Sequence, residues 1–141
     1  MVWARFVVAS LWALVVLTLG SAPFGAQQTE PFVVPFLNVL LPHASPDVLD
    51  AVHLLLRKLA HVTEYAVLAL LWFTALGSVM GGPTRRAAPW AALAICLACA
   101  FADEMHQSTL PTRTGSARDF LIDAVGATTM LVVARGRQGP V

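Results

Sequence analysis

Ionisable side chains gather in residues 57–65, just ahead of an apolar run. Lys58, His61 and Glu64 are spaced three residues apart, so on a helix they share roughly one face. Arg57 and Tyr65 flank them. Further polar groups stand near the ends of two later apolar segments: Asp103, Glu104 and Gln107, then Arg113, then Asp119 and Asp123. Ionisable groups in such segments normally face inward and pair, so we expect one buried polar cluster.

The basic members of this cluster favour recognition of an anion. Arg57, Lys58 and Arg113 could donate hydrogen bonds to a phosphate or carboxylate, for which arginine offers a bidentate fork. His61 and Glu64 would orient these donors. We therefore predict a ligand-binding site made of the following residues: Arg57, Lys58, His61, Glu64, Tyr65, Asp103, Glu104, Gln107, Arg113, Asp119 and Asp123.

Two other interpretations of these residues stay open. In an enzyme, Glu64 or an aspartate would act as general base and His61 as acid. The pairs His61/Glu64 and Asp103/His106, each three residues apart, could instead hold a metal. A single such pair is a weak signal, and the sequence has no G-x-S-x-G nucleophile motif, so we favour binding over catalysis and expect neither metal nor cofactor. The second alternative is a purely structural cluster that holds helices together.

The composition places these residues in a membrane protein. The chain has 141 residues, of which 57% are hydrophobic and 12% charged, and its mean hydropathy is +0.72. A soluble domain is roughly half apolar and a quarter charged, so this chain has too few polar residues to cover a soluble surface. No basic patch with interleaved aromatic residues occurs, which argues against nucleic acid as a partner.

Four apolar segments could cross the bilayer. The first, residues 2–19, is either a signal peptide with an exit at residues 20–22 or a retained helix, and we favour the helix. The second begins at Ser45, Pro46 and Asp47, a good helix start, and runs to about residue 79. Its length of about 50 Å exceeds the bilayer core of about 30 Å, so its first turns should project outward. The third runs from about 87 to 102, with its helix expected to continue through residues 103–107, and the fourth runs from 118 or 119 to about 134.

The connecting segments differ in character. Residues 23–46 contain five prolines, four of them before the helix start at Pro46, which predicts a linker too broken to span; we expect it at the membrane surface or over the helices. Residues 77–83 read as a turn. Ser116 with Asp119 resembles a capping box at the start of the last segment.

Charge placement predicts the orientation. With four spans, the charged side chains on one side of the membrane are all basic: Arg5, Arg85, Arg86, Arg135 and Arg137. The other side holds all eight carboxylates, all four histidines and the remaining four cations. The positive-inside rule assigns the basic side to the cytoplasm, so the polar cluster should face outward.

Several isolated residues receive simpler interpretations. Cys96 and Cys99 lie inside an Ala-rich apolar run, where we expect packing rather than redox chemistry. We expect His43 and His53 to be exposed. Of the tryptophans, Trp3 and Trp90 suit anchoring at the membrane interface.

Three blocks of the cluster occur in a definite order: R-K-x-x-H-x-x-E-Y at 57–65, D-E-x-x-Q-x-x-x-P-x-R at 103–113 and D-x-x-x-D-x-x-G at 119–126. Over about residues 45–130 this pattern resembles the VanZ-like family of small bacterial membrane proteins. Asp123 departs from it, since the family usually carries asparagine there. The resemblance implies a cell-envelope membrane protein and, through the founding member, a link to susceptibility to the glycopeptide teicoplanin. It implies no established enzymatic activity.

These observations combine into one expectation. We predict a single domain over residues 1–141, an all-α polytopic membrane bundle with about four transmembrane helices and a long second helix projecting outward. It should lie in the inner (cytoplasmic) membrane with both termini in the cytoplasm. The expected partners are the lipid bilayer and an anionic lipid or cell-wall precursor.

Overall fold

The computed structural model describes residues 2–110 and 115–137, and no strand occurs in those ranges. The elements in chain order are α1 (Val2–Leu19), η1 (Ala22–Phe24), α2 (Ala26–Leu40), α3 (Pro46–Gly77), η2 (Gly82–Ala87), α4 (Ala88–Ser108) and α5 (Ala117–Gly136). The predicted all-α fold is confirmed, and the second, third and fourth predicted segments agree with α3, α4 and α5 within a few residues.

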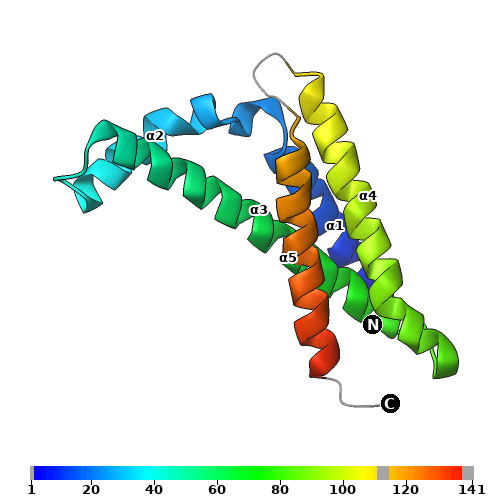
Figure 1. The fold of residues 1–141 in the computed structure, drawn as a ribbon. Coiled ribbons are helices and arrows are strands. Elements are labelled where there is room, and N and C mark those ends of the chain that lie inside the picture. Colours follow the sequence, from blue (N-terminus) through cyan, green and yellow to red (C-terminus); the bar gives the residue numbers. More distant parts are fainter. Residues whose placement is uncertain (1, 111–114, 138–141) are drawn as a thin grey trace.

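Four helices pack into one bundle, in which α3 lies against α1, α4 and α5 (Figure 1). The start of α1 and the end of α5 lie at the same end of the bundle (Figure 1). At that end Nη1 of Arg5 lies 3.5 Å from the carbonyl oxygen of Thr74, which ties the start of α1 to the end of α3. We call this the basic end, because the elements that begin or finish there carry or adjoin five arginines: Arg5, Arg85, Arg86, Arg135 and Arg137.

Three helical segments of the described chain are long and apolar enough to cross a membrane: Val2–Leu19, Pro46–Gly77 and Gly82–Ser108. The fourth member of the bundle, α5, has 20 residues, which at 1.5 Å per residue gives about the 30 Å of a bilayer core. Its first half carries three charged residues, Arg118, Asp119 and Asp123.

The start of α3 follows the sequence pattern. Ser45 is the N-cap, its side chain accepts a hydrogen bond from the backbone N–H of Val48, and Pro46 occupies the first turn. The first half of α3 then projects away from the bundle, side by side with α2 (Figure 1). We call this pair of segments, residues 26–56, the arm.

The predicted linker is largely helical, which its four internal prolines did not indicate. The helix α2 has 15 residues and contains Pro31 and Pro35. Each proline removes one intrahelical hydrogen bond, and packing against α3, where Leu37 is buried, offsets that loss. At 15 residues α2 is too short to span a bilayer, in agreement with the prediction that this segment does not cross the membrane.

The arm also corrects the expectation for His53. This side chain is buried, and its Nε2 lies 3.1 Å from Oγ1 of Thr29 on α2. We expected exposure because no local pattern around residue 53 indicates that a second helix covers this face of α3. His43, between the two helices, is exposed as predicted.

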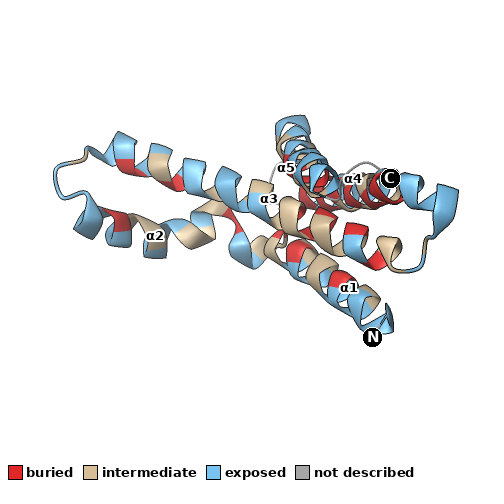
Figure 2. Ribbon diagram, turned by 90° about the horizontal axis from the view of Figure 1, so that it is seen from below, coloured by how far each residue is buried: buried red, intermediate tan, exposed pale blue. Residues whose placement is uncertain are grey.

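The core lies where α3 meets the other bundle helices, and the arm is mostly exposed (Figure 2). The largest buried side chains there include Val16 of α1, Tyr65 and Leu68 of α3, and Cys96 of α4. Cys99 is half-buried against the same core, and both thiols are free, so the packing role predicted for the two cysteines is confirmed.

Candidate functional site

Arg57, His61 and Glu64 line one cavity of about 160 Å³ beside α3. The remaining walls come from the end of α1, the turn that follows, the start of α2 and α3 itself: Leu19, Phe24, Thr29 and Ala60. The i, i+4 and i, i+7 spacing along α3 places the three ionisable side chains on one face. They therefore share one opening at the root of the arm.

Two oxygens of the turn and of α2 hold the guanidinium of Arg57 in place. Its Nη1 donates to the carbonyl oxygen of Phe24 at 2.9 Å and to Oγ1 of Thr29 at 3.4 Å. The same Thr29 hydroxyl contacts His53. Arg57 is thus fixed at the junction of α2 and α3, with a cationic group at the cavity wall.

His61 connects the cavity with the interior of the bundle. Its Nδ1 lies 3.2 Å from Oδ1 of Asp123 on α5, and the exposed fractions of the two side chains are 16% and 0%. A carboxylate can only accept, so this contact suits the imidazole with its proton on Nδ1. Nε2 makes no hydrogen bond to the residues that the structure describes, and it is the ring nitrogen left for a molecule in the cavity.

A glycine allows α5 to approach α3 closely enough for this contact. A Cβ added at Gly126 would come within 3.0 Å of the Cα of Val62, and closer still to its carbonyl oxygen. Val62 directly follows His61, and Gly126 lies one turn after Asp123. Small residues at helix contacts permit such close backbone approach within membranes.

Lys58 and Asp119 form a separate pair outside the cavity. Nζ of Lys58 lies 2.9 Å from Oδ1 of Asp119, and the side chains are 49% and 32% exposed. Exposed ion pairs of this kind contribute little to stability. The pair therefore links α3 to the start of α5 but does not line the candidate site.

The polar end of α4 packs behind these residues and is buried. Gln107 donates from Nε2 to Oδ2 of Asp103 at 2.9 Å, one turn apart on the helix. The backbone N–H of Ser116 donates to Oε2 of Glu104, so the Ser116–Asp119 capping box is not formed as predicted. Ser116 is still the N-cap of α5, because its hydroxyl accepts from the N–H of Arg118. Gly20, directly after α1, leaves room for the Asp103 carboxylate, which a Cβ there would overlap.

Three buried polar atoms in this interior have no hydrogen-bond partner among the described residues. They are Oη of Tyr65, Oε1 of Glu104 and Oδ2 of Asp123. Leaving such atoms unpaired costs about 1–3 kcal/mol each, and native proteins satisfy most of them.

The predicted single cluster is therefore divided into three parts. Arg57, His61 and Glu64 line the cavity, and His61 joins it to Asp123. The buried interior holds Tyr65, Asp103, Glu104 and Gln107. Lys58 and Asp119 pair at the surface, and Arg113 lies outside the described residues.

The proposed metal pair on α4 has one buried and one exposed member. Asp103 is buried, whereas His106 is exposed. Within residues 2–110 and 115–137, no three His, Cys, Asp or Glu side chains converge as a metal site would require.

Several residues that line the candidate site, or hold its walls in place, were not predicted from the sequence. Thr29, Phe24 and Leu19 line the cavity although they precede the charged stretch by about 30 residues or more of chain. Trp12 of α1 donates from Nε1 to the carbonyl oxygen of Glu64 at 3.0 Å, which fixes α1 against the same turn of α3. Recognising α2 as a helix packed on α3 would have indicated Thr29, because it faces His53.

Comparison with known proteins gives one match. A family model described as VanZ/LLP1 matches residues 6–137, a range that covers most of α1 and the whole of α2, α3, α4 and α5. No curated protein and no solved structure matches the chain. The similarity thus extends well beyond the three polar blocks.

Proposed function

Because the chain belongs to the VanZ/LLP1 family of membrane proteins, we propose that the cavity at Arg57, His61 and Glu64 binds the anionic head group of an envelope lipid or of a lipid-linked cell-wall precursor. The observation that carries this proposal is the shared cavity itself. It brings a fixed guanidinium together with a histidine and a carboxylate, and arginine is the preferred partner of phosphate and carboxylate groups.

The surroundings of the cavity favour a ligand that arrives from the bilayer. The arm next to it exposes large apolar side chains: Phe32, Phe36, Val39, Leu54 and Leu55. Exposed apolar residues in such number suit a helical pair lying in the membrane interface. A cavity at the root of that arm would then lie at the level of the lipid head groups.

The membrane placement forms part of the proposal. Three segments can span a membrane, and the basic end gathers arginines without a carboxylate. By the positive-inside rule this end lies in the cytoplasm and the cavity opens at the outer face of the inner membrane. Such a site could bind a cell-wall precursor and thereby alter teicoplanin susceptibility.

Native mass spectrometry of the detergent-purified protein tests the binding proposal. We expect a co-purifying anionic lipid on the wild type that is lost from Arg57→Gln. Arg118→Gln is the matched control, because Arg118 is an exposed arginine that does not line the cavity. Equal lipid on both variants, or none on the wild type, would contradict the proposal.

The His61–Asp123 contact favours a second candidate, a membrane-embedded enzyme acting on the bound lipid. Nε2 of His61 would take a proton from a water or hydroxyl nucleophile and return it to the oxygen of the leaving group, while Asp123 stabilises the imidazolium. Conversion of a purified lipid precursor by the wild type and not by His61→Asn would support this candidate. If the protein binds the lipid precursor without converting it, the enzyme candidate is contradicted and the binding function stands.

A further inference from the structure

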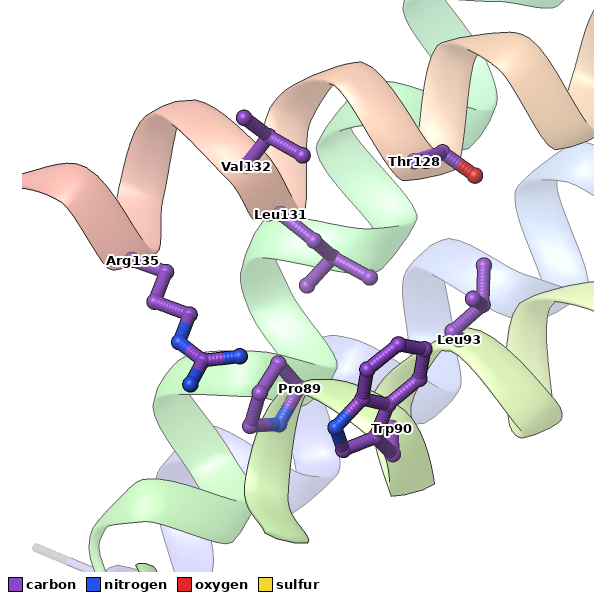
Figure 3. A pocket seen from close by; sticks show the side chains of 7 residues that line it. All are labelled: Pro89, Trp90, Leu93, Thr128, Leu131, Val132 and Arg135. Atoms are coloured by element: carbon purple, nitrogen blue, oxygen red, sulfur yellow. The ribbon is translucent and has the colours of Figure 1, made fainter. Parts of the chain in front are cut away.

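A shallow apolar groove of about 90 Å³ separates the first turns of α4 from the last turns of α5, far from the cavity at Arg57 (Figure 3). Its buried floor is Pro89 and Leu131. Leu93 and Val132 line its sides. The groove belongs to the basic end of the bundle, because α4 starts and α5 finishes there (Figure 1).

Two side chains at one end of the groove differ in chemistry from the rest. Arg135 extends from α5 beside Pro89, and Trp90 lies on the opposite wall (Figure 3). Trp90 is 65% exposed, and tryptophans of this kind gather where hydrocarbon meets head groups. Arg135 forms no ion pair with the described residues and is exposed. The apolar groove therefore has a cationic side chain, Arg135, at the same end as Trp90, a residue suited to the membrane interface.

We propose that this groove binds one phospholipid with a net negative head group, taken from the leaflet at the basic end. One acyl chain would lie along Leu93, Leu131 and Val132, and the phosphate would accept hydrogen bonds from Arg135. Basic pockets between transmembrane helices are recognised sites for anionic lipid head groups.

Charge complementarity selects this occupant over a zwitterionic lipid. The basic end carries Arg5, Arg85, Arg86, Arg135 and Arg137 and no carboxylate, so the potential around the groove is positive. A single arginine near the surface enriches an anionic lipid about fivefold. A zwitterionic lipid places a cation beside its phosphate and would gain much less.

Quenching of the fluorescence of Trp90 by brominated lipids tests this proposal. The full-length protein is placed in vesicles of phosphatidylcholine with phosphatidylglycerol as the minor component, and brominated acyl chains are carried on one lipid at a time. Bromine quenches tryptophan fluorescence only at close range, and subtracting the Trp90→Phe signal isolates Trp90 from the other three tryptophans. We expect the same amount of brominated chain to quench Trp90 about fivefold more effectively on phosphatidylglycerol than on phosphatidylcholine.

Two glutamine substitutions locate the site. Arg135→Gln should abolish the excess quenching, whereas Arg137→Gln, an equal charge change at the same end but outside the groove, should keep it. Val132→Phe, which fills the groove and retains Arg135, should also abolish it if Arg135→Gln does not fold. No excess on the wild type, an excess that survives Arg135→Gln, or equal loss in both arginine variants would overturn the proposal. The prediction holds whether or not the cavity at Arg57 binds a ligand.

Discussion

Gly126 of α5 lies directly against the backbone of Val62 of α3, with no space for a side chain between them. This contact sets the distance between two helices that carry the two partners of the His61–Asp123 pair. Gly126 therefore allows the His61–Asp123 contact to form one turn away on α5.

We expect Gly126→Ala to lower the unfolding free energy by about 1–3 kcal/mol, because the added Cβ must push against backbone that cannot rotate away. Thermal unfolding of the purified protein in detergent measures the change. Gly136→Ala is the control on the same helix, since a Cβ there meets nothing within 4 Å. A Gly126→Ala protein as stable as Gly136→Ala would show that the helices are less close than described.

The two acid–base pairs between α3 and α5 should differ in their contribution to stability. Lys58→Ala breaks the exposed pair and should cost at most about 1 kcal/mol. His61→Ala leaves the Asp123 carboxylate buried without its partner and should cost about 3–5 kcal/mol.

Adding Asp123→Asn to His61→Ala should recover part of that loss, because the amide removes the buried charge and keeps the shape. Unfolding in detergent again provides the measurement. If the double variant were no more stable than His61→Ala alone, the two side chains would not be coupled. Full recovery of stability and of lipid binding together would favour the purely structural interpretation of the cluster.

Thr29→Val should loosen the junction of the arm with the bundle. The hydroxyl accepts from Arg57 and contacts His53, and replacing it by a methyl group leaves both without this partner, at a cost of about 1–3 kcal/mol. We expect faster proteolysis within residues 26–56 and weaker lipid retention. Thr63→Val is the control, because its hydroxyl bonds only to Leu59 of its own helix. Equal proteolysis of the two variants would argue against the role of Thr29.

Cysteine labelling tests the orientation. In a Cys96→Ala, Cys99→Ala background, a cysteine introduced at Ser45 should react with a membrane-impermeant maleimide on cells with a permeable outer envelope. Gly81→Cys, at the exposed turn after α3, should react only after the inner membrane is opened. The reverse pattern would place the basic end outside and the cavity in the cytoplasm.

The sequence by itself determined the class of protein and most of its elements. Apolar segments of spanning length, the Ser45–Pro46 start of α3 and the glycines at 77–82 act locally, so the helix bounds follow from neighbouring residues. The polar blocks also identified the family, and the match over residues 6–137 confirms it. Helical spacing put His61 and Glu64 on one face, but it assigned Lys58 to that face, whereas Arg57 lines the cavity and Lys58 pairs with Asp119 outside it.

Only the tertiary structure decided which charges meet. Lys58 pairs with Asp119 and His61 with Asp123 because α5 crosses α3 at Gly126, a contact between residues about 60 positions apart that no local pattern encodes. The helix α2 was missed because prolines dominate its local signal, whereas packing on α3 determines its structure. Burial of His53 and the walls that Phe24 and Thr29 give the cavity follow from that packing. Pairing across helices depends on distance in space, and the sequence specifies that distance only through the whole fold.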